Sequence, residues 1–182
     1  MIEKYTELLE LVEATLIHGI FFSVALIIFV KLLSKNKIKT ALSVRIIRLI
    51  LVTYALATIV HLVCMLVFNE WDSYAFLSRL TGQYRLVYIF MLLSNTIVPL
   101  VLIHNKIGRK LGLLFTIALV MNFGWIMESI IIHITNTHRC VGATSYGQFW
   151  HTNTIISAIY RGLILGAVLT LVEQGIKKWR NS

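Results

Sequence analysis

Six polar side chains stand out because they lie within apolar stretches of this 182-residue sequence: His18, His61, Asn122, Glu128, His133 and Arg161. Polar and ionisable groups at such positions are rare and are often functional. An imidazole can hydrogen-bond a quinone carbonyl or ligate a haem iron, and a carboxylate inside a membrane can relay protons. These six residues therefore form the candidate site. Ordinary packing is the competing interpretation for His18 and His61, and solvation at the outer surface is the competing interpretation for His133.

Five apolar stretches carry these residues: Ala14–Leu33, Arg45–Phe68, Tyr84–Ile103, Leu111–Thr135 and Asn153–Ile176. A helix of about twenty residues, rising about 1.5 Å per residue, crosses a hydrocarbon core about 30 Å thick. The composition agrees, with 58% hydrophobic residues and a mean hydropathy of +0.81. The sequence thus predicts an all-α integral membrane protein, with a single domain of five transmembrane helices over residues 1–182.

Basic residues gather on one side of the predicted membrane. Twelve of them lie in or next to the first and third loops or after the last span, whereas four lie on the opposite side and Arg161 lies deeper inside a span. Cytoplasmic loops carry an excess of Lys and Arg, so we expect the N-terminus outside and the C-terminus in the cytoplasm. The formal net charge of +9 is therefore a topology signal. The placement of the basic residues on one side of the membrane argues against nucleic-acid binding, and we expect anionic lipids to screen the basic loops.

The first thirteen residues carry four glutamates and one lysine, the reverse of the basic start of a signal peptide. Glu3, Glu7 and Glu10 share one helical face, which predicts a short amphipathic segment outside the membrane over residues 1–13.

Counting residues from the charged loops places most of the six candidates in the outer half of the membrane. Asn122 lies nearer the midplane, and His104 stands apart at the inner end of the third span. Glu128 and Arg161 have opposite charges at similar depths, so we predict an ion pair between spans four and five. The pair either locks the two helices together or tunes a proton-relaying carboxylate.

Small residues mark a predicted contact face on the fifth span. Gly162-Leu-Ile-Leu-Gly166 is a GxxxG motif, and Ala158 extends the seam by one turn. Such a seam allows another helix backbone to approach closely, either within the bundle or from a partner chain. The two cysteines, Cys64 and Cys140, lie at different depths and predict no metal site. We interpret them as two separate thiols, with a disulfide as the alternative.

Four segments within residues 48–139 follow one another in order: Ser78-Arg-Leu-Thr-Gly-Gln-Tyr84, Leu93-Ser-Asn-Thr-Ile-Val-Pro-Leu100, Val120-Met-Asn-Phe-Gly-Trp-Ile-Met-Glu128 and Ile130-Ile-Ile-His-Ile-Thr-Asn-Thr-His-Arg139. With these segments, residues 48–139 resemble the NrfD/PsrC family of membrane subunits, found in polysulfide reductase-type enzymes and alternative complex III. The segments are similar to the family's R-x-T-G-P-Y, C-N-x-x-x-P-Q, N-x-G-M-W-x-E-R and I-I-V-T-S-L-H-R-D. Ser129 stands where the family has an arginine, and Gln83 where it has a proline.

The resemblance covers only the C-terminal half of those larger proteins. It implies a non-catalytic subunit of a respiratory or redox complex in a bacterial inner membrane, with a mitochondrial inner membrane as the alternative. The subunit would help to form a quinol-binding or proton-conducting module, or would scaffold one. It would carry no cofactor of its own, bind menaquinone or another quinone, and pair with membrane, iron–sulfur or cytochrome subunits.

Two other functions remain open. In the first, His18 and His61 are axial ligands of haem b in a small cytochrome b-type anchor. In the second, the chain is a transporter subunit, although paired broken helices and a polar stripe are not evident in the sequence.

Overall fold

The computed structural model describes residues 8, 11–35, 38, 40–68, 70–82, 85–104, 108–139 and 146–181. Over these ranges, helices are the only regular elements: the π-helical turn η1 (Glu13–Ile17), α2 (His18–Leu33), α3 (Ala41–Phe68), α4 (Glu70–Thr81), α5 (Arg85–Thr96), the 3-10 helix η2 (Val98–Ile103), α6 (Leu111–Arg139) and α7 (Tyr146–Asn181). The prediction of an all-helical protein is confirmed for this part of the chain.

Three helical segments are long and apolar enough to cross a membrane: Ala41–Val67, Arg85–Ile103 and Ile156–Ile176. Two shorter apolar helices, His18–Leu33 and Leu111–Gly124, accompany them. By length and composition the protein thus has the character of a membrane protein. Five crossings and the orientation stay predictions.

Helix boundaries differ from the predicted spans in three places. The first predicted outer loop contains α4, and both α6 and α7 continue into the second. The third predicted span divides into α5 and η2 next to Pro99. Proline has no N–H to donate and its ring clashes with the preceding turn, so an α-helix does not pass through it unchanged. The chain tightens there, and the Leu100 amide bonds the Ile97 carbonyl at 3.0 Å.

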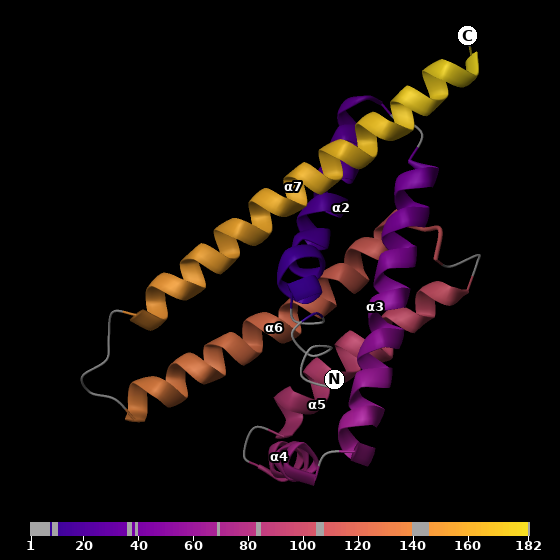
Figure 1. The fold of residues 1–182 in the computed structure, drawn as a ribbon. Helices are drawn as coiled ribbons and strands as arrows, with labels where there is room; N and C mark the ends of the chain where they lie inside the picture. The colour runs from indigo at the N-terminus through magenta and orange to yellow at the C-terminus, as the bar shows by residue number, and fades with distance from the viewer. Residues whose placement is uncertain are drawn as a thin grey trace.

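The buried core follows a three-and-four spacing along several helices. On α2 it comprises Ile17 (in η1), Ile20, Val24 and Ile27, on α3 Val44, Ile47, Leu51 and Tyr54, and on α6 Leu114, Ile117, Ala118 and Met121. That spacing keeps one stripe of each helix turned inward. The central helix is α2, which packs against both α6 and α7 (Figure 1).

The closest helix contact joins α2 to α7 through small residues. A Cβ atom on Gly162 would collide with the Gly19 carbonyl oxygen, and one on Gly166 would lie 3.0 Å from the Ser23 carbonyl oxygen. The Ser23 hydroxyl lies 2.7 Å from the Gly162 carbonyl oxygen and donates to it across the interface. The GxxxG motif is therefore a contact face, as predicted, and of the two predicted partners the structure shows the one within the bundle, the Gly19–Ser23 edge of α2.

Candidate functional site

The six candidate residues have different environments. Two of them, His18 on α2 and Asn122 on α6, are buried. His61 on α3 is half-buried, whereas Arg161 on α7 is exposed. Glu128 and His133 belong to α6, but their side chains lie outside the part of the structure that is described. The predicted Glu128–Arg161 ion pair is therefore untested.

The two buried candidates lie on helices that pack against each other. The Asn122 amide donates to the Ala118 carbonyl oxygen of its own helix at 2.9 Å. This i−4 bond occupies one amide hydrogen within α6 and is a common way to satisfy a polar side chain in a helix. His18 is 5% exposed. The burial of these two side chains is expected both for residues that only pack within the bundle and for residues of a ligand site.

Two segments of the NrfD/PsrC resemblance meet where α5 packs against α6. A Cβ atom on Gly124 would lie 2.9 Å from the Ser94 hydroxyl oxygen and 3.3 Å from the Met91 Cα. Any larger residue at position 124 would push α5 away from α6. The glycine of the third segment thus has a packing role against the second segment.

An apolar groove of about 340 Å³ lies between the start of the chain and α3. Its lining residues are Leu8, Val12, Leu16, Leu49, Ile50, Thr53, Tyr54 and Ala57. The Tyr54 side chain is hydrogen-bonded to the side chain of Glu13. Along α3, Thr53, Ala57 and His61 follow one another at steps of four and so share one helical face. The groove thus combines an apolar floor, a hydroxyl–carboxylate pair and an imidazole one turn beyond its lining.

Tyr54 is not among the candidate residues predicted from the sequence. A tyrosine in an apolar helix is common, and its distinguishing contact with Glu13 joins residues 41 positions apart. The sequence does contain one signal that points to such a contact: Glu13 stands immediately before the first predicted span, where a carboxylate needs a partner.

A second missed residue is Glu173, close to the end of α7. Its carboxylate accepts hydrogen bonds from the Leu42 amide at 3.1 Å, the Ser43 amide at 3.1 Å and the Ser43 hydroxyl at 2.6 Å. These amides belong to the first turn of α3, whose N–H groups have no partner within the helix. Glu173 therefore caps α3 from another helix. Its sequence signal was an acidic residue on the side of the molecule otherwise rich in basic residues.

No group of three or more potential metal ligands is found among the described residues. Comparison with known proteins brings no further assignment: no protein-family model, curated protein or solved structure matches the chain. The NrfD/PsrC resemblance therefore stays a prediction that rests on its four segments.

Proposed function

We propose that this chain is a non-catalytic subunit of a redox complex in a bacterial inner membrane and that it binds a quinone in the groove beside α3. The observation that carries the proposal is the apolar groove of about 340 Å³ flanked by the hydrogen-bonded Tyr54 and Glu13 side chains. Ligand sites in proteins combine such an apolar lining with a few placed polar groups.

The residues fit the two halves of a quinone. Its isoprenoid tail is apolar and matches the aliphatic lining formed by Leu16, Leu49 and Ile50. Its ring carries two carbonyl oxygens, which need hydrogen-bond donors. The imidazole of His61 supplies one such group. The single proton of the Tyr54 hydroxyl becomes available to the second carbonyl when Glu13 is protonated and donates to the tyrosine oxygen.

The proposed roles of the chain are to bind the quinone, to orient it and to exchange protons with it. A bound quinone supplies the electron and proton acceptor. The Glu13 carboxylate orients the Tyr54 hydroxyl through their hydrogen bond. The surrounding aliphatic side chains exclude water from the ring. Electrons would reach the site from iron–sulfur or cytochrome centres on partner subunits, as the NrfD/PsrC resemblance implies.

Filling the groove tests the proposal. Ala57→Leu adds three carbon atoms to the lining, and we expect the quinone extracted from the purified protein to fall about tenfold, since overpacking costs about 1–3 kcal/mol. Ala167→Leu is the matched control because Ala167 is exposed on α7. Extraction followed by chromatography quantifies the quinone per mole of protein.

Tyr54→Phe separates the polar contribution from the apolar one. It removes the hydroxyl and leaves the ring in the groove, so quinone content should drop while the folded protein persists. Equal quinone content in the wild type, Ala57→Leu and Tyr54→Phe would refute binding at this groove. A Soret band in the purified protein, lost in both His18→Ala and His61→Ala, would instead identify a haem b cytochrome.

A further inference from the structure

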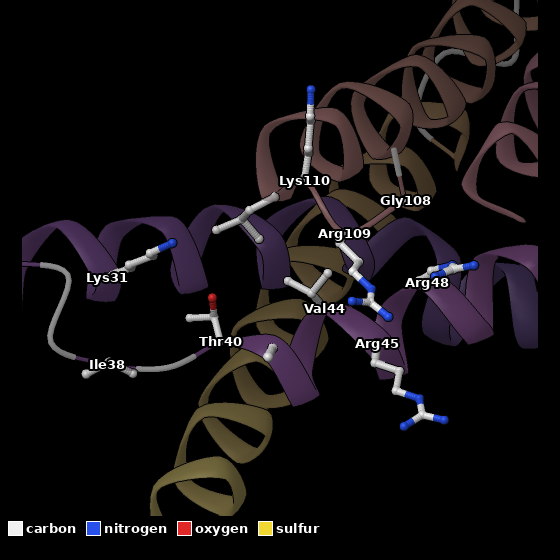
Figure 2. A pocket seen from close by; sticks show the side chains of 11 residues that line it. Lys31, Ile38, Thr40, Val44, Arg45, Arg48, Gly108, Arg109 and Lys110 are labelled. Carbon is white, nitrogen blue, oxygen red and sulfur yellow. The ribbon is translucent and has the colours of Figure 1, made fainter. Parts of the chain in front are cut away.

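A second hollow lies at the end of the bundle where α2 ends and α3 and α6 begin (Figure 2). Its volume is about 930 Å³, towards the upper end of the roughly 300–1,000 Å³ typical of small-molecule sites. Five of its eleven lining residues are basic: Lys31, Arg45, Arg48, Arg109 and Lys110. No acidic residue lines it.

The basic side chains enter from three separate segments. Figure 2 shows Lys31 reaching from α2 towards the open space and Arg109 descending from the loop past Val44 towards Arg45, whereas Lys110 extends away from the others. The Arg48 guanidinium is held by a hydrogen bond of 2.8 Å to the Ile103 carbonyl oxygen. Arg45 and Arg109 are both exposed, so their charged groups are accessible to a ligand.

At one position in the wall of the pocket, residue 108, only glycine fits without a collision. A Cβ atom on Gly108 would collide with the Leu102 carbonyl oxygen and lie 3.0 Å from Arg48 Nε. The loop before α6 therefore packs directly against the fixed guanidinium. This close packing sets the positions of Arg48 and the following Arg109 relative to each other.

The backbone adds to the positive potential. Thr40 and Ala41 lie at the N-terminus of α3, and Lys110 and Leu111 at the N-terminus of α6. Helix N-termini carry a partial positive charge that favours anions. The Glu173 carboxylate lies at the same end of α3, where it is bonded to Leu42 and Ser43, and offsets one of the five charges. The pocket keeps a clear excess of positive charge.

We infer that this pocket binds the headgroup of an anionic phospholipid that carries two phosphate groups. A headgroup with one phosphate would leave most of the positive charge unmatched, whereas two phosphates match it better. A lipid also explains the apolar lining by Ile38, Val44 and Leu111. Acyl chains have an apolar path beside the pocket, because Leu32 and Leu33, which follow Lys31 on α2, are 66% and 68% exposed.

Native mass spectrometry of the full chain in a neutral detergent tests the inference. Diphosphatidylglycerol is titrated against the wild type and the double variant Arg45→Gln/Arg109→Gln. We expect the double variant to bind about 25-fold more weakly, since each basic residue near an anionic headgroup contributes about fivefold. These two arginines are chosen because they are exposed, whereas Arg48 also holds the loop. Lys35→Gln is the matched control: Lys35 is exposed nearby but does not line the pocket.

Three further results distinguish a lipid from a free anion and the pocket from the rest of the basic surface. Phosphatidylcholine should bind no better to the wild type than to the double variant, and inorganic phosphate should not displace the diphosphatidylglycerol. Displacement by inorganic phosphate at comparable concentrations would overturn the lipid assignment in favour of a free anion. An equal loss in Lys35→Gln would overturn the pocket and indicate only diffuse surface charge.

Discussion

The carboxylate of Glu173 joins α7 to the start of α3 at a single point. It is 9% exposed and accepts three hydrogen bonds, all from Leu42 and Ser43. Charge-assisted bonds of this kind are stronger than those between neutral groups. The first turn of α3 thus depends on a residue 130 positions further along the chain. This makes Glu173 a structural residue at the end of the molecule that also holds the basic pocket.

We predict that Glu173→Ala destabilises the protein by about 1–3 kcal/mol, because it leaves buried donors without an acceptor. Unfolding in detergent micelles, followed by circular dichroism, measures the change. Gln174→Ala is the control, since Gln174 is the next residue on α7 and is exposed. Equal losses from the two substitutions would show that the carboxylate contributes nothing beyond helix propensity.

The bond between the Ser43 hydroxyl and Glu173 allows a sharper measurement. Ser43→Ala removes the 2.6 Å bond and leaves the two amide bonds in place. Residues that share a hydrogen bond show coupling energies of about 0.5–3 kcal/mol in double-mutant cycles. We therefore expect Ser43→Ala with Glu173→Ala to cost less than the sum of the single changes. Strict additivity would contradict a direct interaction.

At the scale of the elements, the α2–α7 crossing organises the helices through its backbone contact. Gly19 and Gly162 lie so close that neither accepts a Cβ atom in place: on Gly19 it would lie 3.0 Å from the Gly162 amide nitrogen. Between apolar helices in lipid, van der Waals packing and interhelical hydrogen bonds replace the hydrophobic effect as the force for association. The Ser23 bond to Gly162 supplies the polar part of this contact.

We predict that Gly162→Ala costs about 1–3 kcal/mol, because its methyl group would force α2 and α7 apart. Gly175→Ala on the same helix should be neutral or stabilise the protein by up to about 1 kcal/mol, since alanine has the higher helix propensity. A Cβ atom on Gly175 would meet nothing within 4 Å. Thermal unfolding of both variants in one detergent makes the comparison. A stable Gly162→Ala would mean that the two helices do not cross at this contact.

At the scale of the whole molecule, four helix ends lie together. The basic pocket joins the end of α2 to the starts of α3 and α6, and Glu173 brings the last turns of α7 to the same place. With five crossings, the first loop, the third loop and the C-terminus share one side of the membrane, and the N-terminus lies on the other. The arrangement is therefore consistent with the five predicted crossings.

We predict that Lys35→Cys and Arg109→Cys react with an impermeant thiol reagent only from the cytoplasmic side. Ser78→Cys, on α4, should react from the opposite side. All three positions are exposed. Each variant is made after Cys64 and Cys140 have been replaced by serine, and labelling is compared between intact cells and inverted vesicles. Labelling of position 35 from outside would reverse the orientation, and labelling of positions 35 and 109 from different sides would disprove the two crossings predicted between them.

The sequence by itself determined the features that arise from local order. The length and apolar character of the segments predicted helices, and the spacing of Ala158, Gly162 and Gly166 predicted a contact face on the last span. Local patterns suffice for these features because helix periodicity and residue size act within a few turns. The division of the third span next to Pro99 is also a local feature, because proline acts on the turn that precedes it. The span was nevertheless predicted as continuous.

Only the tertiary structure decided which residues meet. It assigned Gly19 and Ser23 to the α7 seam, paired Tyr54 with Glu13, and placed Glu173 at the start of α3. It also gave buried positions to His18 and Asn122 and an exposed one to Arg161, although all three lie in apolar stretches. Depth along a helix can be counted from the sequence, but the direction in which a side chain points depends on which neighbour covers that face. That choice is made by packing between segments far apart in the chain, where close approach and hydrogen bonding select one arrangement.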